Sequence, residues 1–157
     1  MKNSGINIHA TGIVLGRQGF LIVGPSGSGK SRLARTLLAN ATQTGIFAAL
    51  ISDDQIWIEP KTGTVLAHRA ETIRDLIEVR FSGIVQMPSI RSAVIDAVLM
   101  PVSAGSDTER LPNLYETMEI LPQMSLPVLR LCADFNPDVA MVKNLMQSRM
   151  GGQHAPF

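Results

Sequence analysis

Short apolar runs that stop at glycine or at polar residues recur along the chain, and segments with helical spacing separate some of them. Residues 6–15 are rich in Ile, Val and Thr, and residues 20–23 and 47–51 are apolar throughout, so each is expected to form a strand. Residues 92–100 predict a further central strand. Because strands and helices alternate only in part, the pattern favours a mixed sheet over a purely parallel one.

Three segments have the spacing of helices. The first starts at Ser31 and gathers its apolar side chains on one face: Leu33, Ala34, Leu37, Leu38 and Ala41. Residues 72–80 have the same spacing at Ile73, Leu76 and Ile77. Asn136 and Pro137 are typical of a helix start, and the helix that follows is expected to bury Val139, Val142 and Met146.

The remaining segments predict turns and short extended pieces. Residues 56–58 and 64–66 flank a Pro-Lys-Thr-Gly sequence and predict a hairpin. Residues 105–113 are polar and predict a loop, and Pro112, Pro122 and Pro127 predict that the next stretch is divided into short extended pieces. We therefore expect a single α/β domain over residues 1–150, followed by a flexible tail over residues 151–157.

Composition narrows the class of protein. Of 157 residues, 45% are hydrophobic and 17% are charged, which excludes disorder for most of the chain. The net charge of +1 argues against nucleic acid as the main partner. Cys132 is the single cysteine, which excludes an internal disulfide. No apolar stretch reaches 18 residues and no signal peptide is evident, so we expect a cytoplasmic protein without a membrane span.

The strongest local signal lies between the second predicted strand and the first predicted helix. The sequence Gly24-Pro25-Ser26-Gly27-Ser28-Gly29-Lys30-Ser31 fits the phosphate-loop pattern G-x-x-x-x-G-K-[ST]. Glycines let successive backbone N–H groups approach a phosphate, and the helix directs its positive end at the same anion. Lys30 would reach the β- and γ-phosphates and the Ser31 hydroxyl would bind Mg²⁺. The alternative is a glycine-rich turn that binds nothing.

An acidic pair ends the strand after the phosphate loop. Asp53 and Asp54 follow residues 47–51, and an acid at this place can hold Mg²⁺ or accept the proton of an attacking hydroxyl. Neighbouring strand residues point to opposite faces, so the two acids are expected to do different work. Which of them faces the metal stays open, and a solvated turn is the alternative reading of the pair.

Four further residues have an ordinary structural reading beside a functional one. His9 lies in the first predicted strand, where a lone histidine is usually a core or rim residue. Glu78 and Arg80 are two positions apart and would form a surface ion pair of small energetic value. Arg110 lies in the polar loop, where an exposed arginine is the default.

Taken together, these motifs resemble the C-terminal catalytic domain of the HPr kinase/phosphorylase family. The resemblance runs from about His9 to about Val128, in this order: Ile8-His9-Ala10-Thr11-Gly12, Phe20 to Ser31, Leu50-Ile51-Ser52-Asp53-Asp54, Leu76 to Ile84, Glu109-Arg110-Leu111-Pro112 and Pro127-Val128. It implies an α/β P-loop kinase core with a mixed sheet flanked by helices. The spacing from histidine to loop to acidic pair is far more specific than the loop alone.

The resemblance also implies an activity. Members of the family phosphorylate a serine of HPr, the small phosphocarrier of the bacterial sugar phosphotransferase system, with ATP or sometimes pyrophosphate, and many also remove that phosphate by phosphorolysis. It implies that Asp54 is the general base, that Lys30 binds phosphate and that Ser31 and Glu78 hold Mg²⁺. It further implies that His9 and Arg110 assist at the reacting phosphate, and that the protein forms an oligomer, since the family commonly forms hexamers.

The chain departs from the family pattern at three places. Arg32 stands where the family usually has an acid, and Phe81 replaces the first glycine of the family's E-[IV]-R-G-x-G sequence. After Pro127-Val128 the glycine-containing basic turn tied to phosphorolysis is absent. The family's N-terminal domain is also missing, so the chain resembles a short, catalytic-core form. Phosphorolysis is therefore the less supported activity.

Two other functions fit the same motifs. One is a P-loop kinase for a small metabolite, which usually carries an arginine-rich lid that this sequence lacks. The other is a non-catalytic nucleotide-sensing module. If the protein is instead a kinase of the HPr type, its acceptor could be HPr itself or an HPr-like phosphocarrier of a nitrogen-related system.

Overall fold

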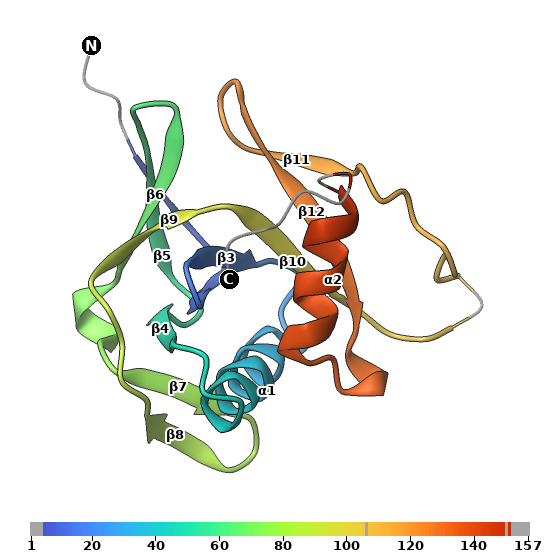
Figure 1. The fold of residues 1–157 in the computed structure, drawn as a ribbon. Helices are drawn as coiled ribbons and strands as arrows, with labels where there is room; N and C mark the ends of the chain where they lie inside the picture. The colour runs from blue at the N-terminus through green and yellow to red at the C-terminus, as the bar shows by residue number, and fades with distance from the viewer. Residues whose placement is uncertain (1–4, 106, 150, 152–157) are drawn as a thin grey trace.

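The computed structural model describes residues 5–105, 107–149 and 151. Over these residues a six-stranded sheet forms the centre of the molecule (Figure 1), in the order β11-β12-β10-β3-β2-β4. The strands are β2 (Thr11–Leu15), β3 (Gln18–Ile22), β4 (Ala48–Ser52), β10 (Ala97–Val102), β11 (Thr117–Leu121) and β12 (Met124–Cys132).

The strand directions bring the functional loops to one edge of this sheet. β10 is parallel to both β3 and β12, and β2 is antiparallel to both β3 and β4. β3, β4, β10 and β12 therefore all run the same way, and the segments that follow them leave from the same edge. The mixed α/β sheet expected from the sequence is confirmed.

Two helices cover one face of the six-stranded sheet. α1 (Lys30–Gln43) buries the apolar face expected of it, and α2 (Val139–Arg149) buries Val139, Val142 and Met146. The backbone N–H of Val139 donates to the side-chain oxygen of Asn40 at 3.0 Å, so α1 supplies a partner for the start of α2. At the other end of α2, the Arg149 guanidinium donates to the carbonyls of Leu114, Glu116 and Val128.

A second sheet covers the opposite face. It is antiparallel throughout, in the order β1-β5-β6-β9, with β1 (Ile6–Ile8), β5 (Ile56–Lys61), β6 (Thr64–Arg69) and β9 (Ser92–Ile95). A separate apolar cluster that includes Leu21, Ile56 and Ile58 lies between the two sheets. The hairpin expected near residues 56–66 is confirmed and is longer than expected.

Two segments that look like single strands each contribute to both sheets. Residues 6–15 divide into β1 and β2 around His9 and Ala10, and residues 92–100 divide at Asp96. Asp96 accepts the Gly19 N–H at 2.8 Å and donates its own N–H to the Gly19 carbonyl. Burial raises the pKa of the Asp96 carboxyl. An acid inside an apolar run therefore marks the transfer of the chain from one sheet to the other.

The helix expected over residues 72–80 is wrong. A single 3₁₀ turn, η1 (Glu71–Ile73), is followed by β7 (Leu76–Val79), which pairs antiparallel with β8 (Gly83–Gln86). Asp75 has a left-handed backbone (φ +59°), and its carboxylate accepts from the Ser89 N–H and hydroxyl. These bonds lower the pKa of Asp75. Bonds to a residue fourteen positions away, together with the pairing of β7 with β8, have overridden the helical spacing of three apolar residues.

The C-terminal third follows the sequence more closely. The described residues of the segment 105–113 form neither helix nor strand, and η2 (Ala133–Phe135) precedes α2. The break expected at Pro127 is wrong: Pro127 lies within the nine-residue β12, at a position paired with edge strand β11, where a proline is tolerated. The expected tail over residues 151–157 lies outside the described residues except for Gly151. Among the described helices, none has the length and apolar character to cross a membrane.

Candidate active site

The segment between β3 and α1 has the backbone of a phosphate-binding loop. Gly24, Gly27 and Gly29 have φ values of +156°, +80° and +91°. A Cβ on Gly24 would lie 2.6 Å from the Ser28 hydroxyl, so the loop has no room for a side chain there. Gly29 caps α1 without a side-chain hydrogen bond, which leaves the first-turn N–H groups of the helix for an anion.

Lys30 is held at the mouth of this loop. It is only 6% exposed, and its ammonium donates to the carbonyls of Gly24 at 3.0 Å and Pro25 at 3.2 Å. The same nitrogen lies 3.4 Å from Nε2 of His9. A phosphate at this point would stabilise the Lys30 ammonium more than the neutral carbonyls do, because hydrogen bonds between two charged groups are stronger than those to a neutral acceptor.

Asp53 is the acid that meets the phosphate-loop serine. It is 5% exposed, and its Oδ1 accepts from the hydroxyls of Thr11 and Ser31, both at 2.8 Å. Its Oδ2 accepts from the Glu78 backbone N–H at 3.0 Å. The carboxylate therefore links β2, α1 and β7 directly beneath the loop.

Asp54 faces the other way, although both acids lie just beyond the last residue of β4. Its backbone is left-handed (φ +65°), which aspartate tolerates, and its side chain is 61% exposed. One carboxylate oxygen lies 3.0 Å from Nδ1 of His9. His9 thus lies between Asp54 and Lys30, with one ring nitrogen toward each.

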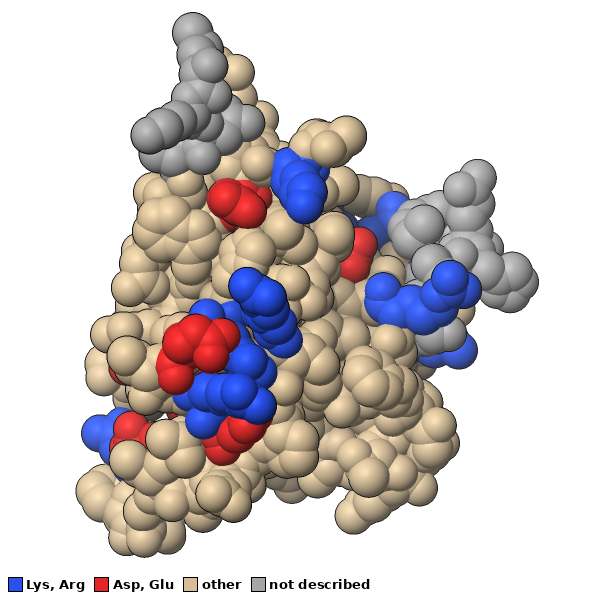
Figure 2. All heavy atoms as spheres, turned by 90° about the vertical axis from the view of Figure 1, so that its left-hand side faces the viewer, with Lys and Arg blue, Asp and Glu red and all other residues tan. Residues whose placement is uncertain are grey.

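A cavity of about 540 Å³ opens over these groups. Four cationic and two acidic side chains line it, together with loop glycines: Lys30, Arg32, Arg35, Arg80, Asp54 and Glu78. Figure 2 shows Lys and Arg side chains interleaved with Asp and Glu on one part of the surface. Two buried polar atoms of this region, Ser28 Oγ and Arg35 Nε, have no partner within the described residues. Such atoms and an excess of positive charge suit a polyphosphate ligand.

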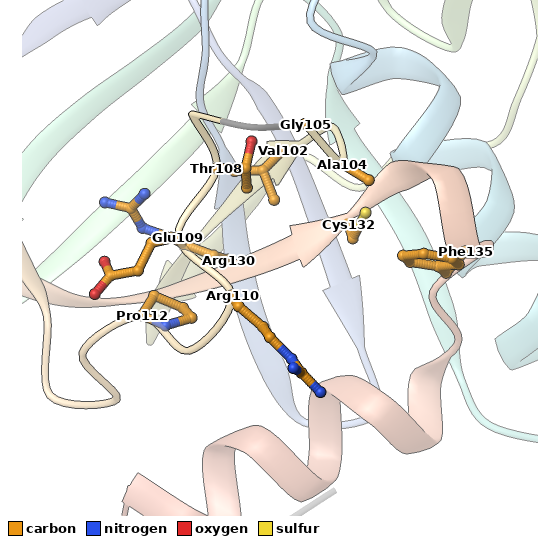
Figure 3. Close-up of a pocket in the computed structure, with 10 residues that line it drawn as sticks. All are labelled: Val102, Ala104, Gly105, Thr108, Glu109, Arg110, Pro112, Arg130, Cys132 and Phe135. Atoms are coloured by element: carbon orange, nitrogen blue, oxygen red, sulfur yellow. The ribbon is translucent and has the colours of Figure 1, made fainter.

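The sequence-predicted residues fall into two places. His9, Lys30, Ser31, Asp53, Asp54 and Glu78 lie together at the phosphate loop. Arg110 lines a different cavity, of about 330 Å³, with Cys132 and Phe135 (Figure 3). Its role at the reacting phosphate stays a prediction.

Sequence reasoning missed Arg35 as a residue of the site. It lies three positions after Arg32 on α1, and residues three apart share a helix face, so this spacing was the available signal. Arg80 was noted only as a partner of Glu78. Its guanidinium instead lies near Gly27, with Nη1 2.8 Å from where a Cβ would be, and 5.4 Å from the centre of the Phe81 ring.

The donor atoms beside the loop suit Mg²⁺. They are oxygens of a hydroxyl and of carboxylates, from Ser31, Asp53 and Glu78. Within the part of the chain that the structure describes, no group of three or more His, Cys, Asp or Glu side chains could hold a metal by itself. In nucleotide sites Mg²⁺ takes one or two protein ligands and completes its coordination with phosphate oxygens and water.

The fold is shared with a solved structure. The chain matches the "Hpr(Ser) kinase/phosphatase from Coxiella burnetii" with a TM-score of 0.72 and 21% sequence identity, over 94% of this chain and 99% of that chain. At this identity the match shows the fold, and the catalytic-domain fold expected from the sequence resemblance is confirmed. No protein-family model matches the chain, and no curated protein matches it either.

Proposed function

We propose that this chain is an ATP- and Mg²⁺-dependent protein serine kinase whose acceptor is HPr or an HPr-like phosphocarrier. The observation that carries the proposal is the placement of Asp54. Its exposed carboxylate lines the same cavity as Lys30 and is held by His9, which also contacts Lys30. A proton acceptor therefore lies at the phosphate-binding end of the site, where an acceptor hydroxyl has to approach.

Each residue of the site has a distinct task in this proposal. Asp54 accepts the proton of the attacking serine, and the His9 ring keeps its carboxylate turned toward the loop. Lys30 leaves the loop carbonyls for the transferred phosphate and neutralises its charge. Arg35 and Arg80 add positive charge along the cavity.

The metal belongs to the other side of the loop. Ser31 would bind Mg²⁺, with Glu78 as a further ligand, and Asp53 would position the Ser31 hydroxyl through the hydrogen bond at 2.8 Å. When bound, Mg²⁺ supplies neutralisation of the phosphate oxygens during in-line transfer. Asp53 is buried and fully hydrogen-bonded, which suits a positioning role better than proton transfer.

The surface beside the cavity favours a protein acceptor over a small metabolite. The β7–β8 hairpin carries Phe81, Ile84 and Val85, which are 98%, 70% and 41% exposed, and Phe81 also lines the phosphate-loop cavity. Large exposed apolar side chains at the rim of a site are typical of surfaces that contact another protein. The family resemblance and the likeness to an Hpr(Ser) kinase/phosphatase name HPr as the first candidate.

The experiment is a transfer assay. The protein is mixed with Mg·ATP and purified HPr, and intact-mass measurement and fragmentation locate any added phosphate. One phosphate on a serine of HPr is expected, and phosphate added afterwards tests for pyrophosphate release by the reverse reaction. Binding of ATP without transfer to any HPr-type protein would reject the kinase assignment and leave a nucleotide-sensing module. Light scattering on the same sample measures the expected oligomer.

A further inference from the structure

A second cavity lies on the same edge of the sheet as the phosphate loop. Its walls are formed where β10 and β12 end, with Val102 and Cys132 at its base, and by the segment after β10 (Figure 3). β10 is the direct neighbour of β3, and the Val23 N–H bonds to the Leu99 carbonyl of β10 at 3.0 Å. Pro101, adjacent to Val102, lies 3.9 Å from where a Cβ on Gly24 would be. The cavity and the phosphate loop therefore lie at the ends of two neighbouring parallel strands, β10 and β3.

The cavity has the chemistry of a pocket for a flat organic group. Its volume of about 330 Å³ is at the lower end of small-molecule sites, and its lining is largely apolar. Phe135 lies on one wall with 71% of its surface exposed, and in Figure 3 its ring extends from η2 toward the space beside Cys132. A largely exposed aromatic ring at the wall of a pocket is a platform on which a base can stack.

The charges around this cavity do not favour the binding of a phosphate there. Arg130 is held by two bonds to the Glu116 carboxylate, at 2.8 and 2.9 Å, and that carboxylate raises the pKa of Arg130 further. Arg110 is the remaining cation of the lining, and the acid Glu109 adjoins it. The phosphate-loop cavity, with its four cations, is the stronger anion site.

The walls of the cavity are also fixed relative to each other. The Ala104 N–H donates to the Asp134 carboxylate at 2.7 Å, which ties the segment after β10 to η2 beside Phe135. In sheets of this kind, ligands bind outside the carboxyl ends of neighbouring parallel strands. A ligand with an anionic tail in the phosphate loop and a flat head over the next two strands would occupy both cavities.

We propose that this second cavity takes the nucleoside of the triphosphate whose phosphates lie in the phosphate loop, with the base stacked on Phe135. The inference rests on the proposed function only in taking a nucleoside triphosphate as the ligand. It assigns the specificity for a nucleotide over a simple polyphosphate to the cavity residues that follow β10 and to η2.

The test compares two probes, ATP and inorganic tripolyphosphate, by calorimetric titration in Mg²⁺. Phe135→Ala is expected to weaken ATP binding roughly 10-fold and to leave tripolyphosphate binding unchanged. Phe135→Trp keeps the stacking surface and should retain ATP binding. Cys132→Leu, which adds side-chain volume to the cavity, should weaken ATP binding in the same selective way. Phe47→Ala is the control, since Phe47 is 61% exposed and precedes β4, at the opposite edge of the sheet.

Two results would overturn the inference. One is unchanged ATP affinity in both Phe135→Ala and Cys132→Leu. The other is an equal loss for ATP and tripolyphosphate, which would show an effect on the phosphate loop rather than on the nucleoside. Neither result bears on transfer to HPr. Conversely, a selective loss of ATP binding in a protein that phosphorylates no HPr would keep this inference and reject the kinase assignment.

Discussion

Nδ1 of His9 lies 3.0 Å from the Asp54 carboxylate, while Nε2 of the same ring lies 3.4 Å from the ammonium of Lys30. One histidine thus joins the acid that ends β4 to the lysine that begins α1. The sheet makes this possible because β3 and β4 run the same way on either side of β2, with His9 just before β2. In the proposed kinase this ring sets where the proton acceptor lies relative to the phosphate.

Replacing Asp54 by asparagine separates proton transfer from nucleotide binding. Asp54→Asn keeps the shape of the side chain and removes the base, so kcat for phosphorylation of HPr should fall between about 10² and 10⁴-fold. ATP affinity, measured by titration, should change by less than about 2-fold. Glu119→Gln, an exposed change on β11, is the control. A variant at Asp54 with full kcat would remove this residue from the chemistry.

Replacing His9 tests its role as a positioning residue. His9→Ala should lower kcat by about 10 to 100-fold and leave the KM for ATP nearly unchanged, because the ring orients Asp54 and does not itself bind nucleotide in our account. His9→Asn retains a side-chain N–H for the Asp54 carboxylate and should recover part of the loss. A rise in the KM for ATP at constant kcat would place His9 in binding instead.

Phe81 offers a test of the acceptor surface, since it lies at the rim of the cavity and is not one of the proton-transfer or phosphate-binding residues proposed above. Its φ of +64° is unfavourable for a bulky residue, and its side chain is 98% exposed. Phe81→Gly should therefore stabilise the fold by about 1 kcal/mol in urea unfolding, while raising the KM for HPr and not that for ATP. Phe47→Gly, also an exposed phenylalanine but without a positive φ, should destabilise the protein. An unchanged KM for HPr would exclude the hairpin tip from the contact.

The Glu116–Arg130 pair predicts a pH dependence of stability. The two bonds from Arg130 lower the pKa of Glu116 below its unfolded value of about 4.3. A lowered pKa in the folded state gives stability above the unfolded pKa, and this is lost as the pH falls through the folded pKa. Glu116→Gln should therefore cost about 1 kcal/mol at pH 7 and almost nothing near pH 2.

Urea unfolding at both pH values measures the Glu116 effect, with Glu119→Gln as the control. Equal destabilisation by Glu116→Gln at pH 7 and pH 2 would mean that the charge of Glu116 contributes nothing. Its effect would then come from packing or from the neutral hydrogen bonds alone.

The sequence was most informative where a local rule decides the structure. The phosphate loop depends on glycines whose backbone no other residue adopts easily, and α1 depends on an apolar face, so both could be predicted from residues 20–45 alone. The expectation that Asp53 and Asp54 face different ways is met, but β4 ends at Ser52, so the left-handed turn at Asp54 separates them rather than strand alternation. Which acid met Ser31 could not be predicted, since it depends on where β4 lies against β2.

The errors arose where distant contacts override local preference. The spacing of Ile73, Leu76 and Ile77 indicated a helix, but Ser89, fourteen residues after Asp75, fixes a turn, and β8 pairs with β7. The second cavity was equally inaccessible to sequence reasoning. Its walls come from two segments that are distant along the chain. One is the end of β10 with the residues after it, and the other is the end of β12 with η2. Arg110 was assigned to the reacting phosphate by resemblance, and its position along that cavity could not be foreseen.

The most direct test of the central claim is a single-turnover experiment with enzyme in excess over γ-labelled ATP and with HPr present. Acid quenching at successive times, followed by phosphoamino-acid analysis, measures where the label goes. We expect the label to pass to a serine of HPr in the native protein, and to stay on bound ATP in Asp54→Asn. Label released as free phosphate at the same rate with and without HPr, or transferred equally well by Asp54→Asn, would contradict the account.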